Sequence, residues 1–259
     1  TSALGDPNFK AFKDSSTSAH ALVVQGDAYG NDFSPYYYAD GYWSNFISPN
    51  SGLKFPNSSA FAFGTGAFTI EFWVLGSSDN DQDFILEGRV AVGTLHITFG
   101  GYGGTTSNGF RYVGSSTIST TDLISDNTWH HCAAERDASN NVTLYIDGVS
   151  KATGTDTTNY TTTTGDWGIG HSNSSNSNYA KAYFSNFRIV KGSNVYGGAF
   201  TPPTTPLTAV ANTQLLTCQS NRFIDNSSNG LTLTLVGTPK VSTNTPFTQS
   251  KTANVGSGF

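Results

Sequence analysis

Charged side chains are scarce in this sequence, since only 12% of its 259 residues are Asp, Glu, Lys or Arg. The net charge is −5 and the basic residues form no stripe, so we expect no nucleic-acid partner. No apolar run approaches the roughly 20 residues that a membrane helix needs, and no signal peptide is recognisable. We therefore expect no membrane insertion. Methionine is absent and the chain begins at Thr1, which predicts either a removed initiator or a piece of a longer chain.

Cysteine is nearly absent as well. Cys132 and Cys218 are the only two, and each lies in an apolar, strand-like run. This context predicts two buried free thiols, with one disulfide between neighbouring strands as the alternative. No second Cys or His stands at ligand spacing from either cysteine, which argues against a zinc site.

Aromatic residues, by contrast, make up 13% of the chain, and Thr, Ser, Asn and Gly are abundant. This composition favours strands joined by polar turns, and no segment keeps a period of 3.6 residues. Because a sheet must bury one face, many antiparallel strands predict a two-sheet sandwich or jelly roll. The expected strands are 20–25, 43–47, 52–55, 68–75, 84–88, 93–99, 109–113, 129–136, 141–147, 166–171, 180–190, 213–219 and 231–236.

Two segments have recognisable turn or loop chemistry. Asp147-Gly148 in "LYIDGVSK" predicts a two-residue hairpin with positive φ at the turn. The segment "AFTPPTTPLTAV" (199–210) is rich in proline, which a central strand does not accommodate. We expect it to cross the surface of the domain in an extended form.

One segment occurs twice. Residues 12–36 align without a gap with residues 223–247, at an offset of 211. The matched pairs are Phe12 and Phe223, Asp14 and Asp225, Ser16 and Ser227, Leu22 and Leu233, Gly26 and Gly237, and Pro35 and Pro246. Two interpretations stay open. The chain is one unit of a tandem array with a period of about 211 residues, or the second copy closes the domain, with 231–236 beside strand 20–25.

The middle of the chain resembles the laminin-G-like branch of the concanavalin A-like lectin/glucanase superfamily. The motifs that carry the resemblance are "FAFGTGAFTIEFWV" (61–74), "TWHHCAAERDASNNVTLYIDGV" (128–149) and "KAYFSNFRIVKGSNVYGGAFTPP" (181–203). The resemblance implies an all-β, concanavalin A-like jelly-roll sandwich of two antiparallel sheets. The expected organisation is a lead-in segment with an aromatic stretch (1–42), the jelly roll (43–220) and a C-terminal segment that repeats the lead-in (221–259).

Segments like "LLTCQSNRFIDNSSNG" (215–230) flank the laminin-G-like modules of marine phage structural and tail-fibre proteins, and in this respect the chain resembles those modules. That similarity predicts a non-enzymatic structural module displayed on a virion surface, as a fibre or decoration protein, with glycan recognition. The expected partners are other virion proteins, further copies of the chain and a cell-surface glycan. The alternative is a secreted or cell-surface microbial adhesin or filament subunit of the same fold.

Hydrolysis of a glycan is the disfavoured function. The glucanases of this superfamily place two carboxylates on one strand, as Glu-x-Asp-x-x-Glu, because cleavage needs a proton donor and a nucleophile about 5 Å apart. This chain has three glutamates, Glu71, Glu87 and Glu135, and none has a second carboxylate two or four positions further along its strand. We therefore expect no enzyme, and we expect Glu71 to be a paired charge on the surface of the sheet.

The residues of the family motifs have structural explanations. Trp129 is expected to pack across the sandwich. His130 and His131 point to opposite faces of one strand, and a buried, hydrogen-bonded histidine is expected there in place of a catalytic one. Arg136 and Asp147 flank the same hairpin and are expected to pair.

One acidic loop suits a cation. Asp79, Asp81 and Asp83 alternate in "GSSDNDQDF", and carboxylates in a flexible loop are ligands that Ca²⁺ accepts. Relatives of this fold that hold Ca²⁺ at the rim of the sandwich support the assignment. The alternative is a solvated acidic loop.

Aromatic residues beside amides are candidate sugar contacts, because a sugar stacks its apolar face on a ring while its hydroxyls bond to planar groups. The candidate carbohydrate-binding residues are Tyr102, Asn108, Asn159, Tyr160, Asn173 and Tyr179. The densest aromatic cluster, "SPYYYADGYW" (34–43), predicts a protein interface instead. The candidate interface residues are Tyr36, Tyr37, Tyr38, Tyr42 and Trp43.

Overall fold

The computed structural model describes residues 17–18, 44–47, 50–77, 83–88, 95–100, 109–161, 165–173 and 178–247. The chain divides into two compact units, Thr1–Ala39 and Asp40–Phe259, and every strand described lies in the second. The expected strand at 20–25 lies outside the described residues. Within these residues, no helix is long and apolar enough to cross a membrane.

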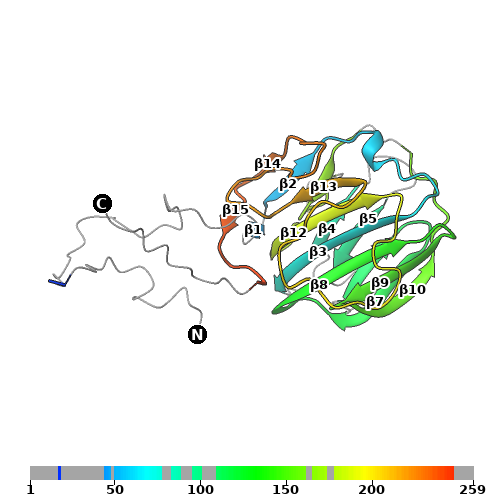
Figure 1. Ribbon diagram of the computed structural model, residues 1–259, viewed down its shortest axis with the longest axis horizontal. Helices are drawn as coiled ribbons and strands as arrows, with labels where there is room; N and C mark the ends of the chain where they lie inside the picture. Colours follow the sequence, from blue (N-terminus) through cyan, green and yellow to red (C-terminus); the bar gives the residue numbers. More distant parts are fainter. Residues whose placement is uncertain are drawn as a thin grey trace. The chain divides into compact units, whose positions relative to one another are not determined.

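The second unit is a sandwich of two sheets, and every pairing between its named strands is antiparallel (Figure 1). Sheet A runs in the order β10 (Val149–Thr155), β9 (Asn141–Ile146), β8 (Asp126–Arg136), β3 (Phe68–Ser77), β12 (Ala182–Lys191), β1 (Ser44–Ile47) and β15 (Lys240–Ser242), and β13 (Thr213–Thr217) also pairs with β12. Sheet B runs in the order β14 (Thr234–Val236), β2 (Gly52–Phe55), β11 (Trp167–Ile169), β4 (Asp83–Glu87), β5 (His96–Phe99), β6 (Gly109–Val113) and β7 (Thr117–Leu123). One 3-10 turn, η2 (Ser59–Phe61), follows β2. The expected all-β jelly-roll sandwich of two antiparallel sheets is confirmed.

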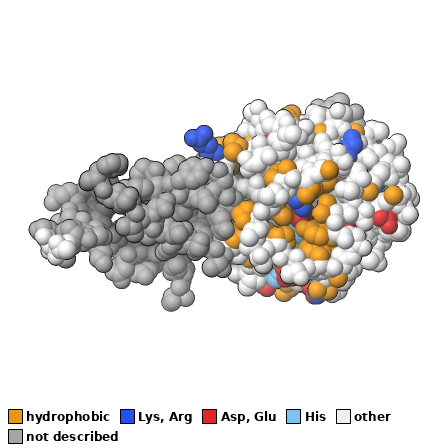
Figure 2. All heavy atoms as spheres, viewed as in Figure 1, with side chains coloured by type: hydrophobic (Ala, Val, Ile, Leu, Met, Phe, Trp, Pro, Cys, Tyr) orange, Lys and Arg blue, Asp and Glu red, His pale blue; other side chains and the backbone are white. Residues whose placement is uncertain are grey.

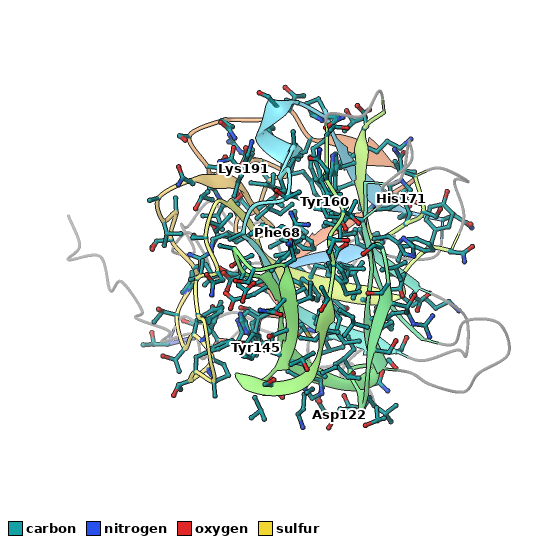
Figure 3. The ribbon with its side chains drawn as sticks, turned by 90° about the vertical axis from the view of Figure 1, so that its right-hand side faces the viewer. Phe68, Asp122, Tyr145, Tyr160, His171 and Lys191 are labelled. Carbon is teal, nitrogen blue, oxygen red and sulfur yellow. The ribbon has the colours of Figure 1, made fainter. Side chains whose placement is uncertain are left out.

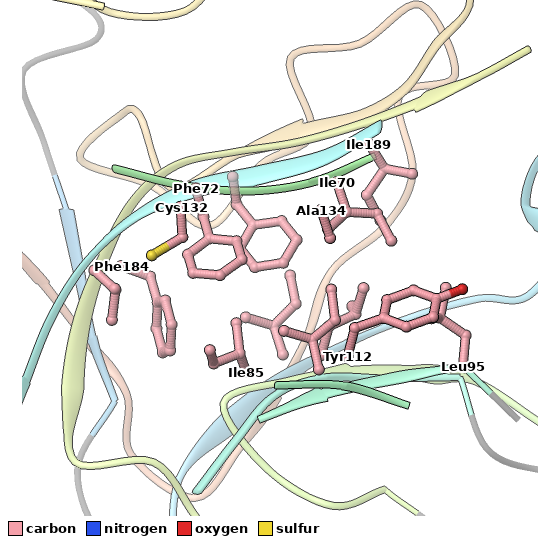
Figure 4. Packing of buried hydrophobic residues seen from close by; sticks show 14 of the residues in the cluster. Ile70, Phe72, Ile85, Leu95, Tyr112, Cys132, Ala134, Phe184 and Ile189 are labelled. Carbon is pink, nitrogen blue, oxygen red and sulfur yellow. The ribbon is translucent and has the colours of Figure 1, made fainter. Parts of the chain in front are cut away.

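The core lies between the sheets and follows the alternation of the strands (Figure 4). On β3, Phe68, Ile70, Phe72 and Val74 are all fully buried. The ring of Phe72 meets that of Phe110 on β6 edge to face, with 5.8 Å between centroids, so the two sheets are in direct aromatic contact. Each such side chain contributes roughly 1.5–3 kcal/mol to folding by leaving water.

A β-bulge in β12 changes which side chains reach the core. Asn186 has φ 54°, and the register with β3 shifts between Ser185 and Arg188. Phe184 and Phe187 are therefore both buried in the core, and Phe187 stacks on Phe72 at 5.2 Å. Beyond the bulge, Arg188 lies on the outer face, opposite Glu71. Strict alternation would have turned Arg188 inward.

Three strands were not predicted: β7, β10 and β15. All three are edge strands with one neighbouring strand each. At these sheet edges even the inner face is only partly covered, so the sequence carries little apolar signal. In β7 only Ile118 and Thr120 are buried, and no residue of β10 or β15 is buried. The hairpin that links β9 to β10 is confirmed, with φ 52° at Asp147 and 77° at Gly148.

The segments around the sandwich are also defined. Residues 199–210 contain no strand, as expected for the proline-rich crossover. In the C-terminal segment, β14 pairs with β2 and β15 pairs with β1, so this segment extends both sheets. Cys132 and Cys218 are free, buried thiols, as predicted. Burial raises the pKa of both, to about 12 for Cys218, which keeps them protonated and unreactive.

Candidate functional site

A buried polar cluster lies on the outer face of sheet A. Arg188 contacts Glu71 with two nitrogens, Nη2 at 2.5 Å and Nε at 2.8 Å from Oε1. His131 Nε2 lies 3.2 Å from Glu71 Oε2, and the hydroxyl of Tyr196 donates to the same oxygen. Burial alone would raise the pKa of Glu71, but the hydrogen bond with His131 and the charge of Arg188 lower it below its ordinary value. The predicted pairing of Glu71 is confirmed, but its place on the sheet surface was wrong, because the segment after β12 buries it completely. His131 is buried and hydrogen-bonded as expected.

The segment that follows β12 lies over this cluster. Tyr196 and Phe200 stack at 3.5 Å, and Glu135 accepts hydrogen bonds from the backbone N–H groups of Tyr196 and Gly197 at 2.7 and 2.9 Å. Glu135 and Glu71 are both buried beneath it. Figure 2 shows apolar side chains gathered on the face over the area where Figure 1 draws β3, β8 and β12. Neither glutamate is open to a substrate.

A second buried carboxylate closes one end of the sandwich. Asp156 accepts hydrogen bonds from the hydroxyls of Tyr112, Tyr160, Ser115 and Thr158, and from the backbone N–H groups of the last two. Burial opposes ionisation, but these donors hold the pKa of Asp156 well below its ordinary value. Tyr160 lies inside the sandwich (Figure 3), where it is 5% exposed and its hydroxyl donates to Asp156. A buried ring offers a sugar no stacking surface, so Tyr160 is corrected to a core residue.

Two expectations about the family motifs were wrong. Arg136 does not pair with Asp147: its guanidinium is fully buried and donates to the carbonyl oxygens of Gly64, Gly66 and Thr158. Asp147 instead contacts His130, with 2.7 Å between Oδ2 and Nδ1.

Trp129 does not pack across the sandwich either. It pairs in register with Leu75, which neighbours the core residue Val74 and therefore faces outward. The Trp129 ring is half-buried beside Tyr183 on the outer face of sheet A, at 6.4 Å.

An open groove with a volume of about 640 Å³ lies where η2, the end of β12, β13 and the C-terminal turn meet. Most of its side chains are uncharged hydrogen-bonding groups. The lining residues are Ser58, Ser59, Ala60, Lys191, Gly192, Asn212, Gln214, Asn229 and Leu231. Sequence reasoning missed this groove, because its walls come from four segments that are far apart in the chain.

Internal hydrogen bonds hold the groove side chains in place. Lys191 Nζ donates to the carbonyl of Ser59 at 2.8 Å, and the amide of Asn229 donates to the carbonyl of Gln214 at 2.9 Å and to its Oε1 at 3.2 Å. The amide of Gln214 donates to the carbonyl of Asn212 at 2.8 Å. These bonds leave further protons on the ammonium and lone pairs on the amide oxygens for a ligand. The lining contains no carboxylate.

Asn173 and Tyr179, two of the predicted sugar contacts, lie on the other sheet. Tyr179 is half-buried and stacks on His171 at 5.7 Å with 11° between the ring planes. A Cβ built on Gly168 would touch both His171 and Asn173, so these side chains share one spot on sheet B. Figure 3 shows His171 and Lys191 on opposite sides of the view. The Asn173 amide and the Tyr179 ring, which lie beside His171, are therefore distant from the groove.

The other predicted sugar and metal residues form no site among the described residues. Asn159 is exposed, and it does not line the groove. Asp83 is 2% exposed at the start of β4. Among the residues with described positions, no three His, Cys, Asp or Glu side chains are grouped as metal ligands. Outside the described residues lie Asp79, Asp81, Tyr102, Asn108, Tyr36, Tyr37, Tyr38, Tyr42 and Trp43.

Residues 48–193, more than half of the chain, match the family model for the concanavalin A-like lectin/glucanases superfamily. The chain belongs to this superfamily. Comparison with curated proteins found no significant match.

Several solved structures are similar at low sequence identity. A Bacteroides ovatus protein provisionally described as carbohydrate-binding matches at a TM-score of 0.54 and 15% identity, over 76% of this chain and 61% of that one. Mouse laminin alpha1 domains LG4-5 match at 0.43 and 12%, over 62% and 44% of the two chains. Domain 4 of a Geobacillus stearothermophilus arabinanase, in complex with arabinotriose, matches at 0.43 and 19%, over 57% and 70%. The chain thus spans about three fifths of the Bacteroides protein and less than half of the laminin fragment.

Proposed function

We propose that this superfamily module binds carbohydrate in the groove between η2, β12, β13 and the C-terminal turn, without cleaving it. The observation that carries the proposal is the lining: three amide side chains, two serines and one lysine around two apolar residues, with no carboxylate. Membership of a superfamily of lectins and glucanases supports the same class of ligand.

The groove chemistry suits a polyol. Each amide offers a donor and an acceptor in one plane, a pattern that matches adjacent sugar hydroxyls. Leu231 and Ala60 provide apolar surface for the C–H face of a sugar ring. The lining has no aromatic ring, so stacking does not contribute and we expect a single site to bind weakly, with a Kd of about 0.1–1 mM. Display of many copies would raise the avidity.

Cleavage of the bound sugar is not part of the proposal. Hydrolysis needs two carboxylates, roughly 5–10 Å apart, on either side of the glycosidic bond. The groove lining supplies none, and the glutamates Glu71 and Glu135 are buried and hydrogen-bonded elsewhere.

The proposed setting is the surface of a virion, in a fibre or decoration protein, and a microbial adhesin or filament is the second candidate. The duplicated segment supports an assembly protein, because a repeated sequence marks a modular boundary. Electron cryomicroscopy of the native particle separates the two settings, by attachment to a capsid or tail in one case and a filament in the other.

The binding proposal is tested by a glycan array, followed by titration calorimetry with the best ligand. We expect Asn229→Ala to weaken binding at least 10-fold. Asn141→Ala is the matched control: Asn141 likewise donates its side-chain amide, at 2.8 Å to Asp137, but lies on β9. Equal affinities of the two variants would contradict the proposal.

Charge and metal dependence have their own controls. Lys191→Ala should weaken binding, whereas Lys151→Ala should not, because Lys151 pairs at 2.8 Å with Asp122, which lies far from Lys191 in Figure 3. EDTA should leave binding unchanged, since no carboxylate lines the groove. Loss of binding in EDTA would move the site to the predicted calcium loop at Asp79, Asp81 and Asp83.

A further inference from the structure

The C-terminal copy of the duplicated sequence, residues 223–247, is the closing segment of the sandwich. Its strands β14 and β15 pair with β2 and β1, so it adds an edge to each sheet. Phe223 and Leu233 pack against the core. The N-terminal copy, residues 12–36, has Phe12 and Leu22 at these two positions.

The turn of the closing segment is organised by Asp225. Its carboxylate accepts hydrogen bonds from the backbone N–H groups of Leu216, Ser227 and Leu231, at 3.0, 2.9 and 2.9 Å. Ser227 also donates its hydroxyl to this carboxylate at 2.8 Å. The N-terminal copy keeps both side chains, as Asp14 and Ser16.

Between β14 and β15, one position admits only glycine. Gly237 has φ +64°, and a Cβ there would lie 2.1 Å from the carbonyl oxygen of Asn50. A side chain would therefore clash with backbone. The N-terminal copy has Gly26 at this position.

An aromatic residue ends the closing segment. Phe247 is 5% exposed and meets Trp73 edge to face at 5.8 Å. The equivalent residue of the N-terminal copy is Tyr36, which also carries an aromatic ring, and it follows Pro35 as Phe247 follows Pro246.

The N-terminal copy also shares a turn with the closing segment. Thr17 and Ser18 form a turn, and their equivalents Ser228 and Asn229 form the turn after Asp225. Exposed positions, by contrast, have changed freely: Ile224, 41% exposed, is matched by Lys13, and the exposed Lys240 by Tyr29. Covered positions differ too: the half-buried Leu231, Val236 and Val241 are matched by His20, Gln25 and Gly30, and the buried Pro239 is matched by Ala28.

We propose that residues 12–36 are a second closing segment, which binds to the sandwich of another copy of this chain. It would occupy the edges of β2 and β1, called the seam below, where residues 223–247 pair in their own chain. It retains the turn carboxylate, the obligatory glycine, two of the three side chains that pack against the core, and an aromatic residue at the end. A segment that retains the main constrained contacts of the one it replaces exchanges between copies at low cost. The covalently attached segment 223–247 has the advantage of a high effective concentration, so exchange occurs where that segment is weakened or displaced.

The test uses the full chain with both copies weakened, Asp14→Ala/Asp225→Ala, and a synthetic peptide of residues 9–39. We expect the peptide to raise the Tm of this variant by several degrees in a saturable way. Peptides with Asp14→Ala or Gly26→Ala should give little or no rise, and their affinity, from fluorescence anisotropy of the labelled peptide, should fall at least 10-fold. A native peptide that gives no rise, or a Gly26→Ala peptide that gives an equal one, overturns the proposal.

A milder variant covers the case in which the first does not fold. Phe12→Ala/Phe223→Ala leaves both turn carboxylates in place, and it is tested with the same peptides. If neither variant responds to the native peptide, by Tm or by recovery of tryptophan fluorescence, the proposal is wrong. The native peptide should leave the wild-type Tm unchanged at equal concentration, because the attached segment already fills the seam.

Discussion

Glu71 and Asp156 are both fully buried carboxylates, yet the protein satisfies them in different ways. Glu71 forms an ion pair with Arg188, supported by His131 and Tyr196. Asp156 is held mainly by uncharged hydroxyl and backbone N–H groups, and Arg136 lies further away, at 3.7 Å. One carboxylate is neutralised by a cation, whereas the other is solvated by neutral donors.

The difference follows from where the partners come from. The donors to Asp156 include Ser115, Tyr112 and Thr158, which belong to loops and a strand that meet at one end of the sandwich. Glu71 lies in the middle of a sheet, where backbone donors are used in the ladder, so its partners are side chains. Arg188 and His131 lie on the adjacent strands, and Tyr196 lies on the segment that follows β12. A buried charge without such partners would cost several kcal/mol.

Asp156→Ala should be the most destabilising substitution, because it leaves several buried donors without their acceptor and the buried Arg136 cation without its neighbouring carboxylate. We expect a loss of about 3–5 kcal/mol in the free energy of unfolding. Urea denaturation followed by tryptophan fluorescence measures it. A loss below about 1 kcal/mol would mean that water replaces the carboxylate at this end.

Glu71→Gln should cost less, about 2–4 kcal/mol, because the amide keeps hydrogen-bonding capacity but loses the charge that faces Arg188. The control is Asp122→Asn, which removes the carboxylate of an exposed pair with Lys151. A surface ion pair contributes about 0–1 kcal/mol, so the two losses should differ clearly in the same urea experiment. Equal losses would show that the buried pair is no stronger than a solvated one.

Tyr196→Phe tests the contact between Glu71 and the segment that follows β12. It removes a hydroxyl that donates to Glu71 but keeps the ring that stacks on Phe200. We expect a loss of about 1–2 kcal/mol, since a hydrogen bond to a charged group is lost. In the Glu71→Gln background the loss should shrink, and an additive loss in the double variant would contradict the contact.

The smallest expected effect is a pH dependence at His130. The hydrogen bond with Asp147 raises the pKa of His130 above 6.5 despite its partial burial, so this contact stabilises the fold at acidic pH. The stability is lost as the pH rises through the folded-state pKa. The wild-type advantage over His130→Gln should therefore be larger at pH 5.5 than at pH 8.5.

The stability that Glu71 and Asp156 contribute changes with pH in the opposite direction. Their pKa values lie below the ordinary 4.5 and 3.8, so their contribution is present at neutral pH and is lost as the pH falls below about 4. Thermal melts between pH 3 and pH 9 separate the two effects. A pH-independent difference at His130 would contradict its assigned partners.

The sequence predicted the sandwich because apolar alternation marks strands that are covered on one face, as in β3 and β8. It missed β7, β10 and β15, since edge strands carry little of that signal. The bulge at Asn186 also escaped prediction. A one-residue shift in register is not visible in the apolar pattern, yet it decides that Arg188 meets Glu71.

The candidate site was harder to predict than the fold. The groove joins Ser58, Lys191, Gln214 and Asn229, which come from different parts of the chain and belong to residue types common on any surface. Tyr160 was predicted as a sugar contact because it is aromatic, but its ring packs in the core and its hydroxyl donates to Asp156. Pairing of distant segments, which composition does not reveal, creates the groove.

The register of β1 with β15 has a mechanical consequence. Ser44, at the start of β1, pairs with Ser242, at the end of β15, so the chain enters and leaves this strand pair at the same end. A pull on the two flanking chain segments therefore loads the hydrogen bonds one pair after another, as a zipper opens, and does not shear them all together. A module displayed in flow or under tension would release its last strand at low force, while β3, β8 and β12 stay intact.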